Sequence, residues 1–142
     1  MADVQFRFRD DAPVDAPVVE FAEALEGSNA SAVRIEPGDD ARELLPILDQ
    51  LALIEVSFPA FTEGRGFSSA RILREAGYTG ELRATGEVLV DMAGHMRRCG
   101  FDAFAPDAPL VESDFEAAIN RWPHVYQKAA DGRDAIWKLR HG

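Results

Sequence analysis

Two glycines flank an arginine in the stretch PAFTEGRGF, where a predicted strand gives way to a predicted helix. The backbone amides of Gly64 and Gly66 and the guanidinium of Arg65 could hold a small oxyanion, because free amides at a helix start and arginine side chains both bind anions. Ser68 and Arg71 follow on the same helix and would add two more donors to the site. The alternative is a loop that only turns the chain and carries a solvated arginine.

Charged residues also stand inside two strands that should be buried, Glu55 in LALIEVSF and Arg83 in GELRA. A buried charge is costly unless it is paired, so the two side chains could pair across neighbouring strands or face a common polar pocket. Arg83 would then add a second guanidinium to the oxyanion site. Glu55, Glu87 and Asp91 are the carboxylates available there for acid or base catalysis. A purely structural ion pair is the alternative for Glu55 and Arg83.

A non-catalytic role is the second class of function that the sequence supports. Arg71 and Arg74 lie three residues apart on one predicted helix, and Arg97 and Arg98 end the next helix. Together they could form an arginine-bearing surface that docks on another protein. Solvated helix faces with weak pairs are the alternative for these residues.

Metal and cofactor motifs are absent from the sequence. One cysteine, Cys99, excludes an intrachain disulfide, and the three histidines show no metal-ligand spacing with it. No dinucleotide fingerprint and no phosphate-cradling lysine motif occurs. We therefore predict no metal and no evident cofactor.

Length and charge narrow the class of protein. The chain has 142 residues, enough for one domain with a core of its own, and its formal net charge of -10 disfavours nucleic acid and anionic membranes as partners. No run of eighteen apolar residues occurs, and the first residues lack the basic and then apolar order of a signal peptide. We expect a cytoplasmic protein that does not bind membranes.

Alternating strand and helix patterns place these residues in an α/β fold. Residues 4–9 alternate as an edge strand does, and residues 18–26 have helical spacing. Strands are then predicted at 32–36, 51–58, 80–84 and 101–104, and helices after them begin at Asp40, Ser68, Glu87 and Ser113. We expect about four βα units on a small parallel sheet, either doubly wound or like a partial barrel.

The expected domain organisation is an N-terminal arm over 1–31 packed on the domain, a βα-repeat domain over 32–126 and a C-terminal tail over 127–142. The open edges of such a sheet need cover, which either the N-terminal arm or the second subunit of a homodimer would provide. Ligands of parallel α/β proteins bind at the carboxyl ends of the strands. That edge should carry the loop 59–67 and Thr85 with Gly86.

Residues 58–104, FPAFTEGRGFSSARILREAGYTGELRATGEVLVDMAGHMRRCGFDAF, resemble a known family. The sequence is similar to small uncharacterised bacterial proteins labelled as probable oxidoreductases involved in sulfite reduction, whose genes often lie beside that of sulfite reductase. It departs from their pattern at Glu63, where Asp is usual, and at Met92, where Gln is usual.

The resemblance implies an accessory role in assimilatory sulfite reduction and supplies no reaction, cofactor or catalytic residue. It agrees with an oxyanion site near Arg65, because sulfite and sulfate are small anions that arginines bind well. The alternative is a protein without activity of its own that docks on sulfite reductase or a related enzyme.

Overall fold

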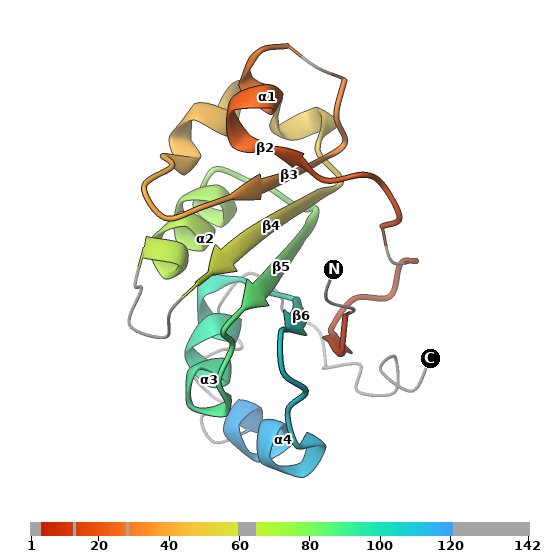
Figure 1. Cartoon of the computed structure of the whole chain (residues 1–142), viewed down its shortest axis with the longest axis vertical. Coiled ribbons are helices and arrows are strands. Elements are labelled where there is room, and N and C mark those ends of the chain that lie inside the picture. The colour runs from red at the N-terminus through yellow and green to blue at the C-terminus, as the bar shows by residue number, and fades with distance from the viewer. Residues whose placement is uncertain (1–3, 13, 28, 60–64, 121–142) are drawn as a thin grey trace.

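All the predicted strands join one sheet in the computed structural model, which describes residues 4–12, 14–27, 29–59 and 65–120 (Figure 1). Six strands follow one another in the order β1-β6-β5-β4-β3-β2. The strands are β1 (Phe6–Arg7), β2 (Val19–Glu20), β3 (Ala32–Ile35), β4 (Leu53–Phe58), β5 (Glu81–Gly86) and β6 (Ala103–Pro106). Strands β2 to β6 run parallel, and β1 pairs antiparallel with β6 as the edge strand that the alternating pattern predicts.

A helix follows every parallel strand. These helices are α1 (Phe21–Leu25), the 3-10 helix η1 (Ala41–Gln50), α2 (Arg65–Glu75), α3 (Val90–Cys99) and α4 (Glu112–Asn120). The expected four βα units are confirmed, and β2 with α1 adds a short fifth unit. Because successive parallel strands always step in the same direction, right-handed crossovers bring the helices to one face of the sheet. This order never reverses, which excludes the doubly wound alternative and favours the partial-barrel type.

The two faces of the sheet differ in chemistry. On β4 the side chains of Ile54, Val56 and Phe58 point to one face and belong to the hydrophobic core. Helix α2 packs there so closely that a Cβ atom on Gly66 would lie 2.4 Å from the Phe58 ring. The helices therefore cover the apolar face, and Glu55 stands on the opposite, polar face.

Several predicted boundaries are wrong, each for a local reason. Helix α2 begins at Arg65 and not at Ser68, so Ser68 lies inside the helix and does not cap it. The segment after Asp40 is a 3-10 helix that contains Pro46, a residue that an α-helix interior tolerates poorly. Residues 18–26 divide into β2 and α1, and α4 begins before Ser113.

Two helix ends are confirmed. The side chain of Asp40 caps η1 by accepting a hydrogen bond from the Arg42 backbone N–H at 3.0 Å. Gly100 ends α3 in the left-handed conformation with a φ of 117°, which favours glycine. The predicted tail over 127–142 lies outside the described residues.

Candidate functional site

A row of charged side chains crosses the polar face of the sheet. Strand register sets Arg34 of β3 beside Glu55 of β4, and Glu55 beside Arg83 of β5. The row continues through Ala103 of β6 to Arg7 of β1. Because successive side chains of a strand alternate between faces, all of these groups point to the same side.

Glu81 completes the row, two residues before Arg83 and on the same face. Its carboxylate accepts hydrogen bonds from Arg7 Nε at 3.1 Å and from Arg83 Nη2 at 2.9 Å. The small side chain of Ala103 stands between Arg7 and Arg83 in the register, and Glu81 bridges the two guanidinium groups.

Glu55 links the other end of the row. It accepts from Arg83 Nη1 at 3.3 Å with one oxygen and from Arg34 Nε and Nη2 at 3.3 Å with the other. The row is therefore an ion-pair ladder of alternating sign, made of Arg7, Glu81, Arg83, Glu55 and Arg34. Four members are buried and the Arg34 side chain is 39% exposed, so the ladder opens to solvent at Arg34.

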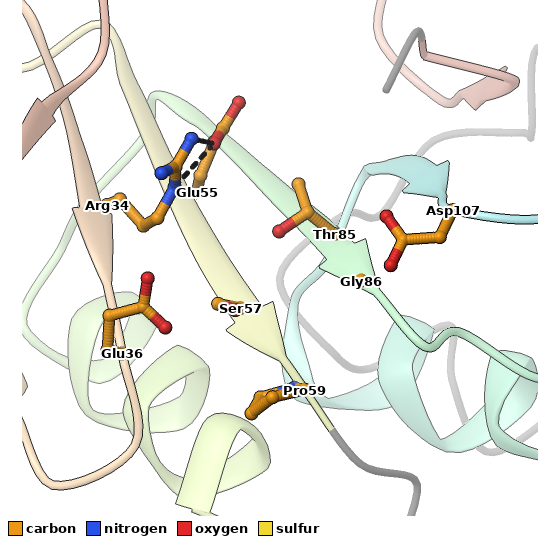
Figure 2. A pocket seen from close by; sticks show the side chains of 8 residues that line it. All are labelled: Arg34, Glu36, Glu55, Ser57, Pro59, Thr85, Gly86 and Asp107. Atoms are coloured by element: carbon orange, nitrogen blue, oxygen red, sulfur yellow. Dashed lines mark hydrogen bonds and ion pairs between the residues drawn. The ribbon is translucent and has the colours of Figure 1, made fainter. Parts of the chain in front are cut away.

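A pocket of about 450 Å³ lies beside this open end, at the carboxyl ends of four neighbouring parallel strands (Figure 2). Its lining residues occupy alternate positions on β3, β4 and β5 and the positions that follow the strands. They are Arg34, Glu36, Glu55, Ser57, Pro59, Thr85, Gly86 and Asp107. The expectation that Thr85 and Gly86 stand at the carboxyl edge is confirmed.

The polar groups of the pocket converge from opposite sides. Figure 2 shows the carboxylates of Glu36 and Asp107 turned toward the space between them, with Ser57 and Thr85 along its floor. Among the described residues, the carboxylates of Glu36 and Asp107 have no hydrogen-bond partner, and Nη1 of Arg34 has none either. The site thus presents acceptors from two sides and donors at Arg34.

Local charge decides which ligands suit this pocket. Four charged side chains line it, one arginine against three carboxylates, of which Glu55 is already neutralised by Arg34 and Arg83. A bare oxyanion would be repelled by Glu36 and Asp107. A molecule that offers hydroxyl or amine donors to these carboxylates would be held.

The residues predicted for the oxyanion site do not gather at this pocket. Arg65 begins α2, and its Nη1 would lie 3.7 Å from a Cβ atom on Gly38, in the loop after β3. Gly66 is buried against Phe58, so its lack of a side chain serves packing. Ser68 and Arg71 are exposed on α2, and Gly64 lies outside the described residues.

The charged residues predicted on the strands, Glu55 and Arg83, do come together in the structure. The prediction that Glu55 and Arg83 pair across neighbouring strands is confirmed by their contact at 3.3 Å. The structure does not bring Arg83 and Arg65 together, because α2 covers the apolar face and Arg83 lies on the polar one. Glu87 and Asp91 are exposed, after β5 and in the first turn of α3, and neither lines the pocket.

Two arginines of the expected docking surface are structural. Arg74 donates to the carbonyl oxygens of Tyr78, Gly80 and Gly100 and pairs with Asp102 at 3.0 Å. Burial raises the pKa of Asp102, and the positive charge of Arg74 opposes that rise.

Arg97 is buried, donates to the carbonyl of Phe101 at 2.7 Å and stacks over the Phe8 ring. Of the four arginines, Arg71 and Arg98 remain for contact with a partner.

Sequence reasoning missed Arg34, Glu36 and Asp107 as pocket residues. A signal was present, because Arg34 and Glu36 stand two apart in AVRIE, as Glu55 and Ser57 do in the next strand. The sequence does not show which strands are neighbours in the sheet. Asp107 can be assigned to the pocket only when the strand order is known, because that order places the end of β6 beside the end of β5.

Comparison with known proteins adds one finding. The sequence profile of the family described as "bacterial protein of unknown function (DUF934)" matches residues 32–137. The chain belongs to the DUF934 family. No curated protein and no solved structure matches it. Neither sulfite reduction nor an oxidoreductase activity follows from membership of the DUF934 family.

Two more features of this DUF934 protein concern metal binding and membranes. Within residues 4–12, 14–27, 29–59 and 65–120, no three His, Cys, Asp or Glu side chains gather as metal ligands do. In the same part of the chain, no helix has the length and apolar character needed to span a bilayer.

Proposed function

We propose that this DUF934 protein binds a small polar molecule in the pocket at the carboxyl ends of β3 to β6. The observation that carries the proposal is a pair of carboxylates, Glu36 and Asp107, that face one space above the hydroxyls of Ser57 and Thr85 and that no other described residue engages. The pocket volume of about 450 Å³ is within the range of small-molecule sites.

The chemistry of the pocket specifies the ligand. Glu36 and Asp107 accept hydrogen bonds, so the ligand carries hydroxyl or amine groups. Arg34 has a guanidinium nitrogen available, so a carboxylate or other acidic group on the ligand would contact it. An amino acid or an amino-polyol has both kinds of group.

The ion-pair ladder supports the proposal by fixing one wall of the pocket. Glu55 accepts two hydrogen bonds from Arg34, and Glu55 is itself held by the buried Arg83. A guanidinium positioned in advance loses less conformational freedom when a ligand binds.

A ligand screen tests the proposal. Thermal unfolding would be measured with amino acids, amines, polyols, sulfite and sulfate, because a molecule that binds only the folded state raises its stability. Glu36→Gln and Asp107→Asn should each weaken binding of the active ligand by roughly 10-fold to 100-fold, as expected for a hydrogen bond to a charged group. Glu26→Gln, which changes an exposed carboxylate directly after α1, is the matched control and should bind normally.

The contradicting results are equally specific. Stabilisation that Glu36→Gln and Asp107→Asn leave unchanged would place the ligand elsewhere. Absence of stabilisation by every class in the screen would refute a small-molecule site with this chemistry.

The role in sulfite reduction is a second part of the proposal and rests on the resemblance of residues 58–104. If the protein is an accessory of that reaction, sulfite reductase from the same cell should copurify with it, or its activity should change when the protein is added. A reductase that neither copurifies nor responds would remove this part and leave the pocket unaffected.

A further inference from the structure

A group of basic and aromatic side chains lies at the contact between α2 and α3. The Phe67 ring of α2 stands 4.6 Å from the His95 ring of α3. Arg71 follows Phe67 by one helical turn and so lies on the same side of α2. Arg98 of α3 places Nη2 3.3 Å from Nδ1 of His95. We call Arg71, His95 and Arg98 the basic seam.

The basic seam concentrates positive charge at the contact between α2 and α3. Among the described residues, Arg71 and Arg98 form no ion pair, in a chain whose formal net charge is -10. The nearest acidic positions along the two helices are Glu75 and Asp91, one turn from Arg71 and His95, and neither forms an ion pair with another residue that the structure describes. The seam is thus a local cationic site on an acidic protein.

The surroundings of His95 favour its neutral form over its protonated form. A guanidinium only donates hydrogen bonds, so Nδ1 of His95 accepts from Arg98, and the proton of the neutral ring sits on Nε2. Nε2 faces Cys99 Sγ at 3.8 Å. Burial lowers the pKa of His95, and the positive charges of Arg98 and Arg71 lower it further.

We propose that the basic seam binds a small inorganic oxyanion such as sulfate, and that His95 takes up one proton from solvent as the anion binds. The anion supplies the negative charge that Arg71 and Arg98 lack. Protonated His95 then donates a hydrogen bond from Nδ1 to the anion. Because Nδ1 no longer accepts from Arg98, Nη2 of Arg98 donates to the anion as well. The seam is separate from the carboxyl-edge pocket, whose residues it does not share.

The charged groups around His95 lie on α2, α3 and α4. Packing against α3 brings α2 and α4 near it, with Arg71 and Glu75 on α2 and Glu112, Asp114 and Glu116 on α4. Of all these groups and those of α3 itself, Arg98 and Arg71 are the ones that shift the pKa of His95.

A titration of His95 by ¹⁵N NMR tests the proposal. The pKa of His95 would be measured in sodium sulfate and in sodium chloride at equal ionic strength, so that screening is the same in both. Sulfate should raise the pKa and chloride should not. Arg71→Gln and Arg98→Gln should each weaken sulfate binding by roughly tenfold, which equals about 1.4 kcal/mol.

Controls separate the seam from general charge effects and from the pocket. Arg42→Gln removes an exposed arginine on η1 and should leave sulfate binding intact. Glu36→Gln should also bind sulfate normally, so failure of one site does not imply failure of the other. The proposal would be overturned if His95 had the same pKa in sulfate and in chloride. It would also be overturned if Arg42→Gln and Arg71→Gln weakened sulfate binding equally. Binding of a glutamate-rich peptide in place of sulfate would overturn it as well, because the seam would then recognise a protein partner.

Discussion

Glu81→Gln is the substitution that most directly probes the ion-pair ladder beneath the pocket. One Glu81 oxygen accepts from Arg7 Nε and Nη2 at 3.1 and 3.0 Å, and the other accepts from Arg83 Nε and Nη2 at 3.1 and 2.9 Å. Glutamine keeps the shape but replaces one oxygen with an NH₂ group, which cannot accept, and it removes the negative charge between the two guanidinium groups.

The size of the effect follows from burial. The side chains of Arg7, Glu81 and Arg83 are 3%, 1% and 9% exposed, so water cannot replace the lost carboxylate. Breaking a buried pair by removing one partner costs about 3–5 kcal/mol, which is a large share of the roughly 5–15 kcal/mol that stabilises a typical domain. The unfolding midpoint should fall by roughly 6–20 °C.

Glu55→Gln provides an internal comparison. It leaves Arg83 with its contact to Glu81, and it leaves Arg34 at the solvent-exposed end of the ladder. We therefore expect a smaller loss of about 1–3 kcal/mol. Glu43→Gln, an exposed carboxylate on η1, should stay within about 0.5 kcal/mol of the wild type.

Urea unfolding followed by far-ultraviolet circular dichroism measures all three free energies of unfolding. The predicted order of destabilisation is Glu81→Gln, then Glu55→Gln, then Glu43→Gln. A Glu81→Gln protein within 1 kcal/mol of the wild type would show that the ladder is hydrated and cannot fix a pocket wall.

Two further predictions concern packing and pH. Gly66→Ala should lower the free energy of unfolding by about 1–3 kcal/mol in urea, because the new Cβ would lie 2.4 Å from the Phe58 ring, whereas Ser68→Ala on the exposed side of the same helix should not. Hydrogen bonds from Arg9 and Arg7 lower the pKa of Asp11 to about 2, so its ionised form stabilises the fold above about pH 4, and this contribution disappears as pH falls through 2. The difference between the wild type and Asp11→Asn in acid urea titrations should therefore shrink below about pH 4, and a constant difference down to pH 2 would contradict this assignment.

Much of the fold was predictable because local signals agree with the final structure. Glycines that end helices, apolar strands and the helical spacing between them gave the βα units in sequence. The pairing of Glu55 with Arg83 was also predictable, since two buried charges of opposite sign need partners.

Other features depend on strand order, which local patterns do not encode. Arg34 and Asp107 reach one pocket because four parallel strands end side by side. The helical pattern of the sequence suggests that Arg74 and Arg97 are surface residues. In the structure, Arg74 donates to the backbone carbonyl of Gly100 and Arg97 donates to that of Phe101. The first turn of α2 also depends on a tertiary contact, because Gly66 packs closely against the Phe58 ring.

An amide NMR titration with the best ligand of the screen is the decisive test of the claim that Glu36 and Asp107 form a small-molecule site. We predict saturable shifts at residues that line the pocket, Glu36, Ser57, Thr85, Gly86 and Asp107, and loss of these shifts in Glu36→Gln. Shifts that saturate at the α2–α3 contact while the pocket amides stay unchanged would contradict the claim.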